Sequence, residues 1–215
     1  MGYVGNGTAL SKIKSPAVNL ADTFAFSGTV TGFDKTPLTL LSTFTSDGSD
    51  ANATFDSSII TDAYDEYLFI FNNLHPENNN VAVTFQASID NGSNYNVAKT
   101  TTNFQTYNDE EDEATTLSYS TGEDHAQATG FLRLGYGLGA ENHESASGIM
   151  KLYNPSSTTF VKHFVCQLHL AEHDHFSIDY YTSGYFNTTS AINNIQFKMN
   201  SGEIQAGTIS VFGVA

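Results

Sequence analysis

The stretch Ala191–Val214, AINNIQFKMNSGEIQAGTISVFGV, decides the fold class. Over Ile195–Met199, apolar residues alternate with polar ones, which is the period of a strand with one buried face. A Ser-Gly pair interrupts this alternation, and Thr208–Val214 resumes it with β-branched residues. We therefore predict two strands joined as a hairpin by the segment SGEIQAG, with Phe197 pointing into a core.

The same chemistry recurs along most of the chain. Turn-forming sequences such as TSDGSDAN separate the apolar segments, and no stretch shows the apolar stripe of a helix. About a dozen strands at this spacing predict an all-β protein, an antiparallel and jelly-roll-like β-sandwich. We expect Tyr64–Asn72 to be buried on both faces, and DNGSN to form a hairpin loop before Tyr95–Thr101. The other predicted strands are Leu38–Thr45, Ala53–Thr61, Val81–Ile89, Thr115–Ser120, Gly130–Tyr136, Gly148–Tyr153, Thr158–Leu170 and Phe176–Phe186.

We predict two parts of the chain, an extended N-terminal arm at residues 1–34 and a β-sandwich domain at residues 35–215. Glycines punctuate the arm, and only its segment TFAFSGTV has clear strand chemistry. The arm holds too few apolar residues to fold alone, so one interpretation is a partly ordered terminus. The other, which we predict, is that Phe24, Phe26 and Val30 dock on a sheet of the same or a neighbouring subunit.

Composition narrows the range of partners. The 215 residues include 8 Lys and Arg against 23 Asp and Glu, which gives a formal net charge of −15. Nucleic acids and anionic membranes would repel such a chain, so we expect neither as a partner. No apolar run approaches the roughly 18 residues of a membrane span, and the first residues lack the pattern of a signal peptide.

Motifs for catalysis are missing from the sequence. It contains no G-x-S-x-G elbow, phosphate-binding loop or dinucleotide fingerprint. The one cysteine, Cys166, lies on the apolar face of a predicted strand, which is typical of a core thiol rather than a nucleophile. We therefore expect no catalytic residues, and a glycan-cleaving enzyme ranks last because no carboxylate pair can be located among so many acidic residues.

Three short segments place histidine beside carboxylates: Glu123–His125, Glu141–Glu144 and Glu172–His175. His173 and His175 could share an ion with a carboxylate from another loop, whereas His163 and His169 lie ~20 Å apart if both are on one strand. No zinc-binding spacing is present. We favour solvated loop residues and predict no metal site here.

Calcium is the more plausible ion. Asp47–Asp50 and Asp109–Glu113 offer oxygen ligands, but neither segment has the ligand spacing of known calcium-binding loops. The alternative is turn chemistry and solubility. We predict no cofactor, with Ca²⁺ as the open alternative.

A tyrosine cluster is the strongest candidate for a binding surface. Tyr180, Tyr181 and Tyr185 occur together with Phe186 in the segment IDYYTSGYFN. Such a group can stack against sugars or form a subunit interface in which one ring edge stays wet. It can also be the core and rim of a sheet. Of the two binding roles we favour the interface over the glycan site.

The ending SGYFNTTSAINNIQFKMNSGEIQAGTISVFGV resembles a pattern in structural proteins of tailed bacteriophages, especially marine ones. The matching positions are Gly184-Tyr185, Ala191-Ile192, Ile195, Ser201-Gly202, Gly207-Thr208 and Phe212-Gly213. The sequence departs from the pattern in having Val-Phe-Gly where Leu-Tyr-Gly is usual. Tyr67–Asn73 and the later FQASIDNGSNY also resemble a strand and a hairpin of these proteins. The shared motifs are structural, so the resemblance implies a virion β-sandwich without an active site.

Two hypotheses follow. The first is a non-enzymatic virion component of tail, fibre or capsid-decoration type, located in the virion and acting through subunit contacts. Its partners would be other virion proteins and copies of itself, with a trimer favoured. The alternative is a lectin-like module that recognises a host-surface glycan through its tyrosines and through calcium. Oligomeric state discriminates between them, because a lone module should be monomeric and have measurable sugar affinity.

Overall fold

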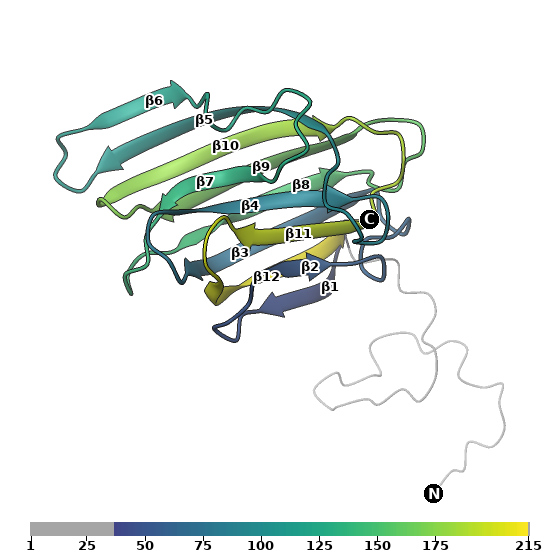
Figure 1. Ribbon diagram of the computed structural model, residues 1–215, viewed down its shortest axis with the longest axis horizontal. Helices are drawn as coiled ribbons and strands as arrows, with labels where there is room; N and C mark the ends of the chain where they lie inside the picture. Colours follow the sequence, from purple (N-terminus) through teal and green to yellow (C-terminus); the bar gives the residue numbers. More distant parts are fainter. Residues whose placement is uncertain (1–36, 215) are drawn as a thin grey trace, which may run out of the picture. The chain divides into compact units, whose positions relative to one another are not determined.

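The computed structural model describes residues 37–214 (Figure 1). The predicted arm, including Phe24, Phe26 and Val30, lies outside the described residues. The described part of the chain contains no helix, and therefore none that could cross a membrane. Its strands are β1 (Leu38–Thr45), β2 (Ala53–Phe55), β3 (Glu66–Pro76), β4 (Val81–Ser88), β5 (Lys99–Asp109), β6 (Thr115–Tyr119), β7 (Leu132–Leu138), β8 (Ala146–Tyr153), β9 (Lys162–Ala171), β10 (Phe176–Phe186), β11 (Asn194–Met199) and β12 (Ile204–Val214).

The strands form two antiparallel sheets that pack against each other, which confirms the prediction of an all-β sandwich. The large sheet has eight strands in the order β1-β12-β3-β8-β9-β10-β5-β6, and the small sheet has four in the order β2-β11-β4-β7. Figure 1 looks onto the small sheet, with the large sheet behind it.

The strand order separates a central unit from an addition to it. The four strands β1-β12-β3-β8 of the large sheet lie opposite the small sheet, and the chain crosses repeatedly between the two. This order agrees with the jelly-roll-like arrangement that we predicted. The two pairs β5–β6 and β9–β10 are inserted into this path and add β9-β10-β5-β6 beside β8. We call these four added strands the extension.

The two hairpins predicted from the sequence are wrong. β11 pairs with β2 and β4 in the small sheet, whereas β12 pairs with β1 and β3 in the large sheet. The DNGSN segment likewise leads from β4 in the small sheet to β5 in the large sheet. A strand with one buried face has the same alternation whether it pairs with its neighbour or crosses to the opposite sheet, so the pattern alone could not separate these cases.

Individual strands also differ from their predictions. Strand β3 is buried on one face only, because Tyr67, Phe69 and Phe71 face the core while its alternate residues are partly exposed. Strand β2 ends at Phe55, well short of the predicted end. The carboxylate of Asp56 accepts hydrogen bonds from the backbone N–H and the hydroxyl of Ser58, at 2.9 and 2.6 Å, and so turns the chain.

Phe197 lies at the centre of the core. Its side chain is 1% exposed, which confirms that it points inward. Its ring centroid lies 6.2 and 6.1 Å from those of Phe55 and Phe85 in the small sheet. It also lies 5.3 and 5.1 Å from those of Phe69 and Phe71 in the large sheet. One side chain therefore links both sheets.

The aromatic core continues into the extension. Phe85 of β4 lies 4.9 Å from Phe164 of β9 and 5.9 Å from Phe186 of β10, measured between ring centroids. Cys166 is buried on the same face of β9 as Phe164, so the prediction of a core thiol is confirmed. Burial raises the pKa of this thiol, which leaves it protonated.

Removing the Phe197 ring should destabilise the whole sandwich. We expect Phe197→Ala to lower the free energy of unfolding by ~3–5 kcal/mol, because the cavity opens between the sheets where neither can collapse into it. Urea denaturation measures the change. The matched control is Gln196→Ala, since Gln196 points away from the core and bonds Thr54. It should change stability by less than about 1 kcal/mol. Equal stabilities of the Phe197→Ala variant and the parent would contradict this account of the core.

Candidate functional site

The extension carries an aromatic pair on the outer face of the large sheet, the face turned away from the small sheet. Phe104 of β5 is paired in register with Tyr181 of β10. Their rings stack at a centroid distance of 4.7 Å and an interplanar angle of 8°. Tyr185 lies further along the same face of β10, with its ring centroid 6.2 Å from that of His163.

The three tyrosines of the predicted cluster are thus divided between the two faces of β10. Tyr181 and Tyr185 are on the outer face, where they can contact a partner. Tyr180 points into the core, is 4% exposed, and donates a hydrogen bond to the backbone oxygen of Tyr136 at 3.2 Å. Its burial does not fit the predicted interface role, because successive residues of a strand face opposite ways.

A groove runs across the outer face beside this aromatic pair. The side chains at its central cavity of about 290 Å³ include Phe104, Ile149, Lys151, Val165, Gln167, Tyr181 and Ser183. A second cavity of about 230 Å³ shares Ile149 and Gln167 with it and reaches Asp179. A third of about 270 Å³ shares Val165 and Ser183 and reaches Tyr185. The shared residues make these cavities neighbours on one surface.

The polar part of the groove centres on Gln167. Its Nε2 donates hydrogen bonds to Oδ2 of Asp179 at 2.8 Å and to the hydroxyl of Tyr181 at 3.1 Å. The other carboxylate oxygen of Asp179, Oδ1, is buried and has no hydrogen-bond partner. The contact with Asp179 raises the pKa of Tyr181, which keeps its hydroxyl protonated. The groove therefore combines the amide of Gln167 and the hydroxyl of Tyr181 with apolar side chains.

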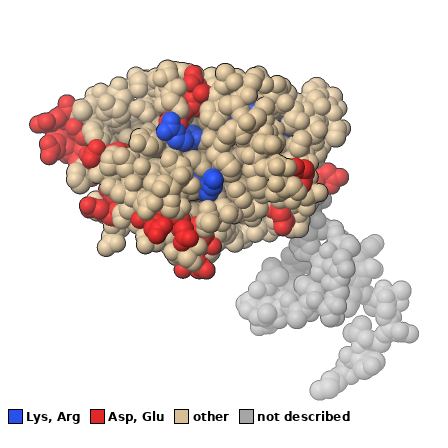
Figure 2. Space-filling view, viewed as in Figure 1, with Lys and Arg blue, Asp and Glu red and all other residues tan. Residues whose placement is uncertain are grey.

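Elsewhere on the outer face, apolar side chains alternate with hydroxyls, amides and imidazoles. Most of the large exposed hydrophobic residues in the described part of the chain point out from this face, namely Leu38, Leu40, Phe104, Leu117, Tyr119, Ile149 and Val165. Charges are sparse on these strands, and Lys151 pairs with Glu66 at an N–O distance of 2.8 Å. By contrast, Figure 2, which looks onto the small sheet, shows acidic side chains gathered toward the margins of the molecule.

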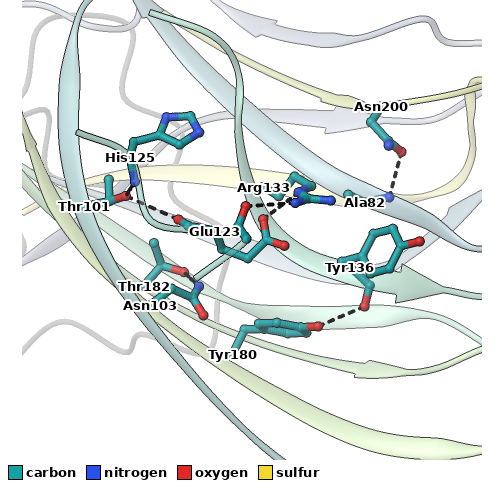
Figure 3. Close-up of polar contacts among 11 residues, drawn as sticks. Ala82, Thr101, Asn103, Glu123, His125, Arg133, Tyr136, Tyr180, Thr182 and Asn200 are labelled. Atoms are coloured by element: carbon teal, nitrogen blue, oxygen red, sulfur yellow. Dashed lines mark hydrogen bonds and ion pairs between the residues drawn. The ribbon is translucent and has the colours of Figure 1, made fainter. Parts of the chain in front are cut away.

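At β5 the inner face of the extension becomes polar. No strand of the small sheet lies opposite β5, and the loop of residues 120–131 covers this part instead. Figure 3 shows the contacts beneath the loop. Asn103 donates to Oγ1 of Thr182 at 2.6 Å, and the backbone N–H of His125 donates to Oγ1 of Thr101 at 2.8 Å. Nε of Arg133 pairs with Glu123 at 2.5 Å.

The titratable groups beneath this loop have shifted pKa values. Burial raises the pKa of Glu123, and the charge of Arg133 partly offsets that rise. Burial, with the nearby charges of Lys99 and Arg133, lowers the pKa of His125. Burial lowers the pKa of Lys99 from 10.5 to about 7. Shifts of this kind often mark active sites. Here Lys99 is 0% and Glu123 5% exposed, so a substrate cannot reach them and their contacts hold the loop to the sheet.

The predicted ion-binding segments form turns. Oδ1 of Asp47 accepts hydrogen bonds from the N–H and hydroxyl of Ser49, and Oδ1 of Asp109 accepts one from the N–H of Glu113. These contacts match the turn chemistry that we weighed against calcium binding. Among the described residues, potential metal ligands gather at Glu172, His173 and Asp174. His175 is not part of that group, and its ring stacks with that of His143 at a centroid distance of 6.4 Å.

Comparison with known proteins gives no assignment. No family model, no curated protein and no solved structure matches the chain. The resemblance of its C-terminal sequence to phage structural proteins therefore gains no support from these comparisons and stays a prediction.

Lys99 should make the free energy of unfolding depend on pH between about 7 and 10.5. Its folded pKa is about 7 and its ordinary value 10.5, so between these values the unfolded chain binds a proton that the folded chain does not. Stability should therefore rise with pH across this window, by up to about 1.4 kcal/mol per pH unit. We expect Lys99→Met to remove this rise. Urea denaturation at a series of pH values measures it.

The control for this experiment is Lys151→Met. Lys151 is half-exposed on the outer face, and its ion pair with Glu66 raises rather than lowers its pKa. This variant should keep the rise that the parent shows. If the free energy of unfolding rises with pH equally in the parent and in the Lys99→Met variant, Lys99 is not the group that causes the rise.

Proposed function

We propose that this protein is a non-enzymatic structural subunit that assembles with copies of itself through the outer face of its large sheet. The observation that carries the proposal is the apolar band that runs along this face from Leu40 through Ile149 and Val165 to the stacked pair of Phe104 and Tyr181. Surfaces that are rich in aromatic and aliphatic side chains and poor in charge are typical of subunit interfaces.

Charge favours a second copy of the chain as the occupant of this face. The chain has a formal net charge of −15, so two copies repel each other over most approaches. On the outer face the ion pair of Glu66 with Lys151 cancels two charges, and Gln167 binds the carboxylate of Asp179. Copies that meet through this face therefore bring few unpaired charges into contact.

Our proposal for where the assembly is located depends on the sequence resemblance alone. The C-terminal motifs favour a bacteriophage virion, in its tail, a fibre or a capsid-associated position, with other virion proteins as further partners. A homotrimer is the assembly that we favour.

A charge placed in the apolar band should block assembly. We expect Ile149→Glu to raise the dissociation constant of the oligomer at least about 30-fold, since a lone buried carboxylate costs about 2 kcal/mol or more. Light scattering over a concentration series measures the mass. The matched control is Ile89→Glu: Ile89 and Ile149 are both 42% exposed, but Ile89 follows β4 of the small sheet. A monomeric parent, or equal masses for the parent and the Ile149→Glu variant, would contradict the proposal.

Glycan binding is the second candidate function. It is favoured by the side chains of Gln167 and Tyr181 that line the groove, because amides and aromatic rings together bind sugar hydroxyls and faces. In this case the protein would be a monomer that recognises a neutral oligosaccharide on a cell surface.

The glycan alternative predicts a different effect of substitution. Gln167→Ala should weaken binding to a neutral oligosaccharide about tenfold, because the contacts that position Asp179 and Tyr181 are lost. Titration calorimetry with oligosaccharides first identified on an array measures the affinity. Gln196→Ala, on the small sheet, is the control and should bind like the parent. Absence of binding to every sugar on the array, together with an oligomeric parent, would reject this alternative.

A further inference from the structure

A cavity of about 470 Å³, larger than those of the groove, lies where β3 ends, β12 begins and the loop of residues 139–145 leads into β8. Its volume is in the range of small-molecule sites, which is about 300–1,000 Å³. It shares no lining residue with the groove cavities. None of its described lining residues is a lysine or an arginine, and most are polar, among them Asn73, His75, Asn142, Glu144 and Gln205.

Irregular strand pairing forms one wall of this cavity. The register of β12 against β3 shifts twice between Ile204 and Thr208. Gly207 has a φ of 104°, and a Cβ at this position would overlap the carbonyl oxygen of Asn73. Bulges of this kind are frequent beside binding sites, because they redirect side chains out of the regular ladder. Here Asn73 and Gln205, one from each strand, line the cavity.

A buried carboxylate is also part of the lining. Glu144 is 2% exposed, and its Oε2 accepts a hydrogen bond from the N–H of Glu141 at 2.6 Å. Gly139 leaves the space for this group, because a Cβ there would overlap the carboxylate. No basic side chain in the described part of the chain forms an ion pair with Glu144. A buried carboxylate is costly without an opposite charge, so a cation bound in the cavity would stabilise it.

Other lining groups can accept hydrogen bonds from such a cation. Nε2 of His75 lies 3.0 Å from the backbone oxygen of Glu141. A carbonyl oxygen only accepts, so Nε2 carries the proton of the neutral ring and Nδ1 is left as an acceptor. The side-chain oxygens of Asn142 and Gln205 are further acceptors. One carboxylate with several neutral acceptors matches an ammonium group, which has three N–H donors and one positive charge.

We propose that this cavity binds a small organic cation through its primary ammonium group, with Glu144 as the counter-charge. The formal net charge of −15 favours the same class of ligand, because it concentrates cations near the protein. Calcium fits less well, since it takes about six to eight oxygens and Glu144 is the one carboxylate among the described lining residues. The site lies apart from the groove and is independent of the function proposed above.

The experiment uses the full chain with putrescine, a short aliphatic diamine, as the probe. We expect calorimetry in amine-free buffer at neutral pH to give one binding site per chain. Butanediol, which has hydroxyls in place of the ammonium groups, should not bind measurably. Glu144→Gln should weaken putrescine binding at least about tenfold, because the charge is lost while the side chain can still accept the N–H of Glu141. Gln205→Ala changes an exposed side chain, so the fold is kept, and should weaken binding about threefold.

Glu141→Gln is the matched control. It removes the same charge from a side chain that is 70% exposed, where salt screens it, so the affinity should change less than about twofold. Equal losses in the Glu141→Gln and Glu144→Gln variants would mean that the general negative charge holds putrescine, and would overturn the proposal. Failure of the parent to bind putrescine, equal binding of butanediol, or displacement of putrescine by one equivalent of calcium would overturn it as well.

Discussion

The packing of Phe197 among phenylalanine rings from both sheets is the contact on which the rest of the structure depends. Phe55 and Phe85 reach it from the small sheet, and Phe69 and Phe71 reach it from the large sheet. The contact with Phe85 is stacked and the other three are edge-to-face, and together they restrict both the spacing and the sliding of the two layers. Because the strands of each sheet are tied to one another by backbone hydrogen bonds, fixing these few rings fixes the relation between the sheets.

The extension differs from the central unit because the small sheet covers only part of its inner face. Near β9 the aromatic core continues through Phe164 and Phe186. Near β5 a loop replaces the small sheet, and the residues beneath it are Thr101, Asn103 and Thr182. A loop has backbone groups to satisfy, so it packs on hydroxyls and amides rather than on aliphatic side chains. The outer face has no such constraint.

Periodicity was sufficient to predict the fold class and the inward direction of Phe197, because burial on one face imposes an alternation that any reader of the sequence can see. Pairing between strands could not be predicted. Strands β11 and β12 are neighbours in the chain but belong to different sheets. Their alternation of apolar and polar residues does not indicate which sheet each strand joins.

The candidate site was predictable only in part. Tyr181 was identified, but its stacking partner Phe104 is distant in sequence and becomes a neighbour only through the pairing of β5 with β10. The same pairing places Tyr180 on the opposite face. Alternation within IDYYTSGYF could have separated the two tyrosines, since Ile178 and Tyr180 share the buried face. The convergence of Glu172, His173 and Asp174 depends on the conformation of a turn, which residue types do not specify.

The added strands also move the open edge of the large sheet from β8 to β6. An uncovered edge is a template for unwanted growth of a sheet by strand addition, and its danger increases with its length. β6 has only 5 residues, and the acidic turn that contains Glu110, Glu111 and Asp112 precedes it. A short strand beside concentrated negative charge is a poor template for another chain. The molecule is therefore protected against amyloid-like aggregation along this edge, and its apolar outer face can stay available for specific contacts.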